Sequence, residues 1–557
     1  MNRILFLLLC ATSLANGQGS FAPLNDDYYH LIDRYEIKSG EINPYLFTAW
    51  KPYKRKSIAH FADSIMAFDN NLSSKDRFNL IYLSNDNWEW SENPNESRKP
   101  FLKRFYTSKS DLYNVREKHF DLHINPVLYL GAGQETEADV KTFTNTRGVE
   151  IRGVVDNKVS FYSFIGENQV VNPVYVRKRI GRDLVVPHEG FWKNFKEDGV
   201  DFFTARGYIN FAATKHIDIQ FGHDKFNIGN GYRSLILSDY SPAYLFLKVN
   251  TKVWKFNYTN LFTQMTAEVF GNANGLTAND AYPNKYLALH HLSLNVSRKL
   301  NIGIFESVIY SKPDSVGNNL ELKYLNPIIF YRAIEQQNGS SDNVLLGLDF
   351  KWIAAKGLSF YGQLTLDEFL FENMKKGDGW WANKYAVQLG GEYIDVLGIS
   401  NLDIQLEANL ARPYTYSHSS QYGEYSNYRQ PLAHPLGANF HEFVGILRYQ
   451  PINRLQVVAK LISAKYGTDG TDENWGGNIL LDNSTREMNF GNKIGQGIET
   501  DLLFADVTLS YQWKHNFFID LKNVYRNQKS EQSTLEESTN YTSIALRWNI
   551  PQRLHEF

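Results

Sequence analysis

Aromatic residues gather in three stretches of the sequence that also carry histidine, arginine, aspartate and amide side chains. They include Tyr416 with His418, the adjacent Trp380 and Trp381, and Trp475. Pyranose rings present C–H faces that stack on aromatic rings, and their hydroxyl groups need polar partners. The chemistry that these stretches suit is carbohydrate binding. The alternative is that the rings pack the loops against one another or belong to a girdle at a membrane interface.

The histidines of the same region do not form a metal-binding motif. His418, His434 and His441 lack the paired spacing and the accompanying carboxylate set of a metal site. His290 and His291 are neighbours in a predicted strand, so their side chains point to opposite faces and do not chelate one ion. We expect no metal ion and no other cofactor.

Charged residues inside the predicted strands come nearest to catalytic chemistry. They are Asp403, Glu407, Glu392, Arg152 and Arg206. Two carboxylates of such a set could cleave a glycosidic bond, but the inward charges of a barrel more commonly solvate or cross-link its lumen. No nucleophile, base and orienting group can be assembled from the sequence. We therefore predict a non-enzymatic protein with no catalytic residue.

The composition excludes other classes of function. The chain has 557 residues, a formal net charge of -2 and 15% aromatic residues. It lacks the basic field of a nucleic-acid-binding protein, and it is richer in aromatic rings than a water-soluble enzyme needs. Beyond the N-terminal segment, no apolar run approaches the ~18–20 residues of a membrane helix. A chain of this kind crosses a membrane only as a closed barrel.

Residues 1–17 have the form of a cleaved secretory signal peptide. Arg3 supplies the positive charge, residues 4–9 form the apolar stretch, and residues 15–17 offer small side chains for cleavage. A lipoprotein site at Cys10 is disfavoured because Leu9 is too bulky for it. Cys10 is the only cysteine, so the mature chain is expected to contain no disulfide and no reactive thiol. We predict export to the outer membrane.

Residues 18–117 show a helical period. Two apolar stripes have the spacing of helix faces: Tyr28, Leu31, Ile32 and Tyr35, then Ile58, Phe61, Ile65 and Phe68. Ser73 followed by Asp76 resembles a capping box at the start of a third helix. Short amphipathic helices need a surface to pack on. We predict a small helical plug in the periplasmic mouth of the barrel, the alternative being a separate periplasmic bundle.

The period changes to two in residues 118–557. Between Leu402 and Leu410, for example, apolar residues alternate with polar residues such as Asp403 and Glu407. We count eighteen such strands, an even number as in single-chain bacterial barrels. They lie near 118–130, 145–155, 158–167, 201–213, 215–226, 242–249, 252–265, 286–298, 300–311, 342–355, 357–367, 384–396, 401–411, 440–450, 453–465, 498–514, 516–526 and 540–550.

The connections between these strands alternate between long and short after the first strand. Short ones include Asp156-Asn157 and Lys356-Gly357, and long ones include 168–200, 312–341, 412–439 and 466–497. An outer-membrane barrel has short periplasmic turns and long extracellular loops. A soluble β-sandwich has no reason to keep this parity. The fold class that we predict is therefore an all-β membrane barrel of about eighteen antiparallel strands with a helical plug.

Two stretches of the sequence carry recognisable motifs. Residues 222–242 read GHDKFNIGNGYRSLILSDYSP, and residues 325–335 read LNPIIFYRAIE before DNVLLG at 342–347. These stretches resemble the family of Wzi-like capsule-assembly outer-membrane barrels. The chain also resembles the RemB-like barrels associated with gliding motility. The resemblance extends from about residue 115 to the end of the sequence. It implies an eighteen-strand barrel with a periplasmic helical bundle, loops folded over the outer end and a role in holding polysaccharide at the cell surface.

Three functions remain open. The first is binding or anchoring of capsular polysaccharide or exopolysaccharide, the second is a surface component of gliding motility, and the third is a diffusion porin. The expected partners are cell-surface polysaccharide, outer-membrane lipid and other envelope or motility proteins, with no nucleic acid. The residues predicted to contact the polymer from the outer loops are Tyr232, Arg233, Tyr331, Arg332, Trp380, Trp381, Tyr416 and His418.

Overall fold

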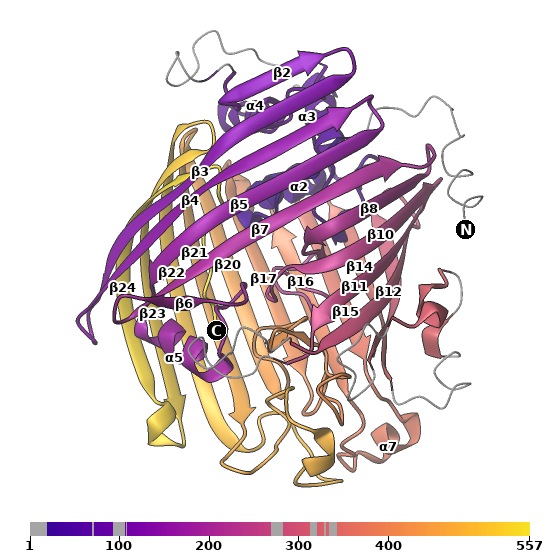
Figure 1. Cartoon of the computed structure of the whole chain (residues 1–557), viewed down its shortest axis with the longest axis vertical. Coiled ribbons are helices and arrows are strands. Elements are labelled where there is room, and N and C mark those ends of the chain that lie inside the picture. The colour runs from indigo at the N-terminus through magenta and orange to yellow at the C-terminus, as the bar shows by residue number, and fades with distance from the viewer. Residues whose placement is uncertain are drawn as a thin grey trace.

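The computed structural model describes residues 19–68, 72–92, 106, 108–268, 282–311, 320–327, 330–332 and 342–557. Within these residues, eighteen antiparallel strands close into one barrel, as predicted (Figure 1). Two short strands, β2 (Tyr113–Glu117) and β6 (Lys193–Phe195), pair with the ends of wall strands. The wall strands are β3 (Phe120–Glu135), β4 (Val140–Val155), β5 (Val159–Val171), β7 (Gly199–Ala212), β8 (Ile217–Asp224), β10 (Tyr244–Val253), β11 (Phe256–Thr266), β12 (Asn284–Asn295), β13 (Leu300–Tyr310), β14 (Asn343–Ala355), β15 (Leu358–Leu366), β16 (Tyr385–Tyr393), β17 (Leu402–Ala411), β20 (Phe440–Ile452), β21 (Leu455–Thr468), β22 (Ile498–Lys514), β23 (Phe517–Ser530) and β24 (Glu537–Trp548).

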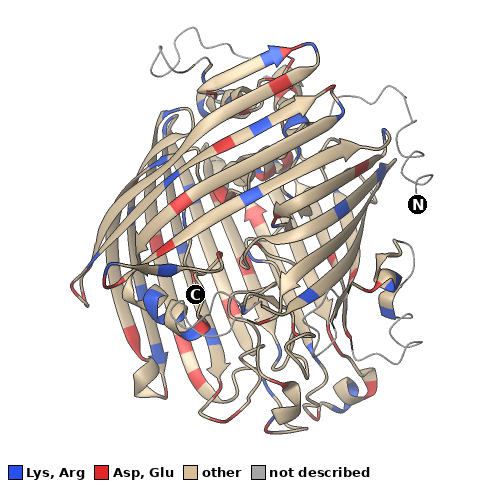
Figure 2. Ribbon diagram, viewed as in Figure 1, with Lys and Arg blue, Asp and Glu red and all other residues tan. Residues whose placement is uncertain are grey.

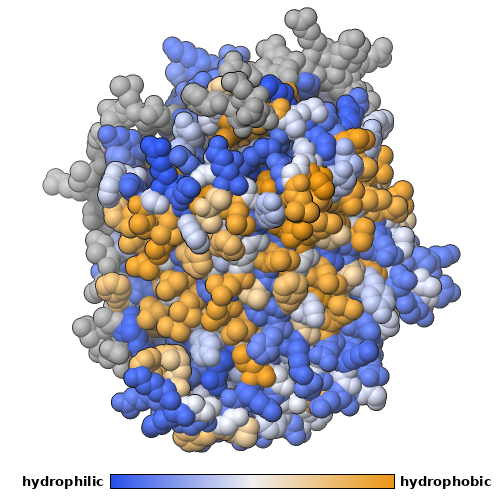
Figure 3. Space-filling view, turned by 180° about the vertical axis from the view of Figure 1, so that it is seen from behind, coloured by the Kyte–Doolittle hydropathy of each residue, from blue (hydrophilic) through white to orange (hydrophobic). Residues whose placement is uncertain are grey.

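The two faces of the wall differ in polarity. In β17, Leu406 is 49% exposed on the outside, whereas its neighbour Glu407 is 1% exposed and points inward. Figure 3 shows a broad apolar band across one outer face, between polar ends. Charged residues also occur at mid-height of several strands (Figure 2). In β4, Glu150 and Arg152 are buried against the lumen. An apolar outside around a polar interior is the arrangement that lipid requires of a closed barrel. The chain is an outer-membrane β-barrel.

Closure of the wall leads to the first testable prediction. β24 pairs with β3 from Tyr541↔Glu135 to Trp548↔Leu128, so the sheet has no free edge. We expect the protein to fractionate with the outer membrane and to migrate faster on a detergent gel unboiled than boiled, since a closed barrel resists unfolding. Recovery as a soluble periplasmic protein, with one mobility at both temperatures, would contradict this architecture.

The connections keep the predicted parity, with short turns at the upper end of Figure 1 and most long loops at the lower end. The lower end carries the helices α5 (Val174–Asp183) and α7 (Phe371–Lys376). Two outer connections, 136–139 and 531–536, are shorter than predicted. The reason is that β3 and β4 continue to pair as far as Glu135↔Val140, and β23 and β24 as far as Gln528↔Glu537, beyond the predicted strand ends.

Three helices stand in the mouth formed by the short turns: α2 (Asp26–Ser39), α3 (Arg55–Phe68) and α4 (Ser74–Asp86) (Figure 1). The predicted capping box is present, since Ser73 Oγ accepts a hydrogen bond from Asp76 N and the Asp76 carboxylate accepts one from Ser73 N. The apolar stripe of α2 is buried between the helices. Among the described residues, no helix has the length and apolarity needed to cross a membrane. The predicted signal peptide, residues 1–17, lies outside the described residues.

The helices are fastened to the short turns around the mouth. The Ile42 amide donates to the Arg298 carbonyl at 2.7 Å, and the Gly357 amide donates to the carbonyl at the C-terminal end of α2 at 3.0 Å. On α4, the Asn79 side chain donates to Gln450 Oε1 at 2.8 Å. These turns belong to different hairpins, so the helices span the mouth as a plug.

Candidate functional site

The connection between β8 and β10, residues 225–243, does not stay at the extracellular surface where the sequence placed it. It enters the lumen, and its strand β9 (Asn227–Ile228) pairs with β1 (Trp50–Lys51) of the N-terminal segment. The physical reason is its apolar run from Leu235 to Leu237, which is buried in the main hydrophobic core of the barrel. The segment is called the lumen loop below.

Arg233 lies at the centre of the lumen loop. Its guanidinium contacts the Glu442 carboxylate at 3.0 Å, and the Arg233 and Tyr232 amides donate to Glu407 at 3.0 and 2.7 Å. Gly231 permits this approach, because a Cβ there would lie 2.6 Å from carboxylate and amide oxygens of the wall. Charge-assisted hydrogen bonds of this kind hold the loop rigidly against β17 and β20.

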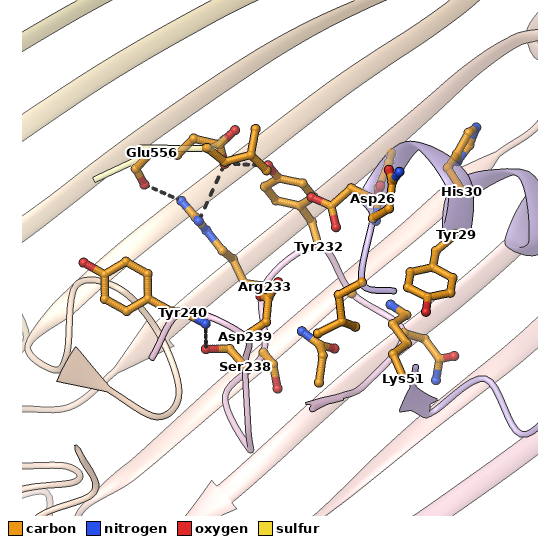
Figure 4. A pocket seen from close by; sticks show the side chains of 18 of the residues that line it. Asp26, Tyr29, His30, Lys51, Tyr232, Arg233, Ser238, Asp239, Tyr240 and Glu556 are labelled. Carbon is orange, nitrogen blue, oxygen red and sulfur yellow. Dashed lines mark hydrogen bonds and ion pairs between the residues drawn. The ribbon is translucent and has the colours of Figure 1, made fainter. Parts of the chain in front are cut away.

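Residues 549–557 form a second segment inside the lumen. Glu556 accepts a hydrogen bond from the Tyr232 hydroxyl at 2.5 Å and pairs with Lys460 of the wall. The Phe557 carbonyl accepts from Arg526 at 3.0 Å. Figure 4 shows the Arg233 guanidinium pointing at this segment, with the Tyr232 ring beside it. The plug, the lumen loop and this segment therefore fill the lumen together.

A polar cavity of about 100 Å³ remains between these three segments. Its lining mixes acids and bases, among them Asp26, Lys51, Glu392, Arg448 and Glu556. Burial, together with the nearby Asp239 carboxylate, raises the pKa of Asp26 to about 6, against the opposing effect of Lys460. The space suits a small cluster of water molecules.

The predicted outer-loop aromatics form a second cluster at the extracellular end. The rings of Trp380 and Trp381 are partly exposed, with centroids 6.0 Å apart, and Trp380 lies 4.9 Å from Phe490. The guanidinium of Arg486 lies 4.0 Å from the centre of the Trp381 ring. Neither indole N–H has a hydrogen-bond acceptor among the described residues. Trp380, Trp381, Arg486 and Phe490 are called the aromatic platform below.

The other predicted contact residues are not brought together with the platform. Tyr416 is fully buried, and its hydroxyl donates to the Leu235 carbonyl at 2.7 Å, so it fastens the lumen loop. Tyr331 is fully buried on the outside of the wall, where Arg332 beside it is exposed. His418 is partly buried, and its Nδ1 has no partner within the described structure. Tyr232 and Arg233 lie in the lumen, Tyr416 is buried against the lumen loop and Tyr331 is packed on the outside of the wall, so none of the four lies in the outer loop layer with the platform. Contact of these residues with a polymer stays a prediction.

Two members of the platform, Arg486 and Phe490, could not be predicted from the sequence. Arg486 and Phe490 lie about 100 residues beyond Trp380, in the loop between β21 and β22. That loop reaches the tryptophans through backbone bonds, such as the Trp381 amide donating to the Asn489 carbonyl at 3.0 Å. Neither residue stands in a motif, so only the fold shows that they complete the cluster.

No family model matches the chain, and no curated protein matches it. Among solved structures, Wzi of Escherichia coli matches with a TM-score of 0.57 at 14% identity, over 96% of this chain and 100% of that one. This chain has the Wzi fold. Wzi is an outer membrane protein involved in group 1 capsule assembly and a carbohydrate-binding β-barrel.

Other solved outer-membrane barrels match less of the chain. OprD of Pseudomonas aeruginosa gives a TM-score of 0.42 at 11% identity, over 77% of this chain and 92% of that one. OccAB2 of Acinetobacter baumannii gives 0.42 at 7% identity, over 78% and 99%. The predicted Wzi-like fold is thus confirmed. The resemblance to RemB-like barrels stays a prediction.

Proposed function

We propose that this barrel is a non-enzymatic surface protein that binds polysaccharide through its outer loops and anchors it to the outer membrane. The observation that carries the proposal is the aromatic platform. It combines the partly exposed indole rings of Trp380 and Trp381 with the guanidinium of Arg486, which lies 4.0 Å from the centre of the Trp381 ring. Sugars use such a combination, since C–H faces stack on rings and hydroxyl groups accept hydrogen bonds. The Wzi fold supports the same proposal.

The filled lumen favours anchoring over transport. Three chain segments cross the interior, and buried ion pairs such as Arg233 with Glu442 hold them to the wall. A diffusion porin keeps a water-filled channel, whereas the cavity of about 100 Å³ here is lined by residues from all three segments. The proposed partners are therefore polysaccharide at the extracellular end and lipid around the apolar band of the wall. Other envelope proteins are further candidates.

The test is a triple variant, Trp380→Ala with Trp381→Ala and Phe490→Ala. A single ring contact contributes about 0.5–1.5 kcal/mol, so a polymer bound at many points tolerates one loss. Removing three rings should lower the binding of purified surface polysaccharide by about tenfold or more, the ratio that about 1.4 kcal/mol gives. Retained cell-surface polysaccharide should fall at unchanged barrel abundance. Tyr416 is left intact because its loss would disturb the lumen loop.

A matched control uses exposed rings of the short-turn end and the wall: Trp254→Ala with Trp352→Ala and Phe256→Ala. It removes the same ring types and should leave polysaccharide binding unchanged. Wild-type binding by the platform variant would mean that its rings only pack the loops. If that variant instead lost surface spreading while keeping its polysaccharide, the gliding-motility role would be favoured.

A further inference from the structure

A patch on the outer side of the wall is buried although it belongs to the face that elsewhere meets lipid. In β13, Ile304 is 52% exposed, whereas Glu306, Val308 and Tyr310, which face the same way, are all buried. Across the register, Glu306 lies opposite His290 of β12. Something outside the barrel must therefore cover the extracellular half of β12 and β13.

The cover is the described part of the connection between β13 and β14, residues 320–327 and 330–332, called the wall clasp below. It includes the helical turn η1 (Leu322–Leu325). The Tyr331 ring stacks on His290 at 4.2 Å, and its hydroxyl lies 2.7 Å from His290 Nε2. The Tyr324 ring lies 4.6 Å from that of Tyr310, and the Tyr258 hydroxyl donates to the Pro327 carbonyl at 2.5 Å.

The wall clasp satisfies polar groups that lipid could not. His290 Nδ1 lies 2.9 Å from Glu306 Oε1, and the second oxygen of Glu306 accepts a hydrogen bond from the Tyr331 amide at 2.9 Å. Ionisable side chains on the lipid face of a barrel are destabilising when they lack partners. The contacts between His290, Glu306 and Tyr331 thus hold the wall clasp flat against the barrel.

The wall clasp exposes three large apolar side chains, beside the exposed polar residues Asn326 and Arg332. Leu322 is 76% exposed and Phe330 is 70% exposed, and Leu320 is exposed as well. The height of the wall clasp follows from the register, since Glu306 lies opposite Leu346, which is itself exposed in the apolar belt. These side chains therefore continue the belt outward at the same level instead of rising into the loop layer.

We propose that the wall clasp is a lipid-contacting element, in which Leu320, Leu322 and Phe330 insert among the acyl chains of the outer leaflet. The occupant is lipid because the patch is continuous with the exposed belt residues Ile304 and Leu346. The wall clasp thus widens the extracellular end of the barrel on one side, because it packs on the outer face of the wall.

Single-cysteine spin labelling tests this proposal. Cys10 is the only cysteine and lies in the predicted signal peptide, so each single-cysteine variant of the mature protein offers one label site. Leu322→Cys and Phe330→Cys would be labelled with a nitroxide in protein reconstituted into phospholipid vesicles. Collision rates with oxygen, which concentrates in lipid, and with a water-soluble nickel chelate would then be compared. We expect high oxygen and low nickel accessibility, matching Ile304→Cys on the bare wall.

Two reference positions define the opposite result. Leu397→Cys, in a short turn and 84% exposed, and Phe490→Cys, in the outer loops, should report water. Nickel accessibility at Leu322 and Phe330 equal to these references would overturn the proposal. Low accessibility to both reagents would also overturn it, because it would mean that a second copy or another protein covers the wall clasp. A gel mobility shift on boiling verifies that each variant is folded.

Discussion

Replacing Arg34 with alanine should release the plug from the barrel while leaving the wall folded. Arg34 of α2 is buried, and its guanidinium contacts Asp395 at 2.5 Å, Asp76 at 3.4 Å and also Asp403 of β17. Without it, Asp76 and Asp403 stay buried near one another with less positive charge to balance them. Removing one partner of a buried ion pair typically destabilises a protein by about 3–5 kcal/mol. Here we expect most of this loss to weaken the docking of the plug in the barrel.

Limited proteolysis of the N-terminal segment measures this release. The Arg34→Ala variant should be cut within the helices many times faster than the unaltered protein. Its barrel should still migrate faster on a detergent gel unboiled than boiled. Arg298→Ala is the matched control. Arg298 is largely exposed, and its ion pair with Glu41, at 3.5 Å, lies at the surface. Such a pair contributes about 0–1 kcal/mol to stability. Equal cutting of both variants would show that the Arg34 cluster does not hold the plug.

Removing the plug together with most of the lumen loop should convert a non-conducting barrel into a channel. The intact protein is expected to show no resolvable current in a planar bilayer, because the plug, the lumen loop and residues 549–557 fill its interior. Deleting the plug alone should leave current low, since the lumen loop still reaches Glu407 and Glu442 of the wall. Removing the plug together with residues 229–240, replaced by a short Gly-Ser linker, should give discrete channel steps.

The deletion series carries its own control, because each variant can be checked for the gel shift of a folded barrel. Large, stable channels from the intact protein would favour a diffusion porin and contradict the filled lumen. Full conductance after plug removal alone would mean that the lumen loop leaves its observed position when the β1–β9 pairing is lost.

Much of the wall could be predicted from the sequence because lipid imposes a local pattern. Each strand must put apolar side chains outside at every second position, as between Leu402 and Leu410, so eighteen strands and their order follow from a period of two. The capping box of Ser73 and Asp76 is equally local. These features need no knowledge of distant parts of the chain.

The site was harder to predict because it depends on contacts between distant residues. Arg233 meets Glu442 and Glu556, which are 209 and more than 300 positions away. The alternation of long and short connections correctly places both ends of the lumen loop at the extracellular end of the barrel. It does not determine whether a long connection extends away from the membrane, folds into the lumen or lies on the wall. Tyr232 lies in the lumen and Tyr331 lies on the outside of the wall, whereas the sequence predicts a position in the outer loops for both.

The pairing of β1 with β9 also fixes an order of assembly. The N-terminal helices leave the export machinery first, yet Trp50 finds its partner Ile228 only after β3, β4, β5, β7 and β8 have followed. During that interval the helices must protect their own apolar faces, and the shared core of Tyr28, Ile32, Ile58 and Leu80 gives them the means. During assembly the helices of the plug can therefore pack on one another before β9, the strand that docks them inside the barrel, has arrived.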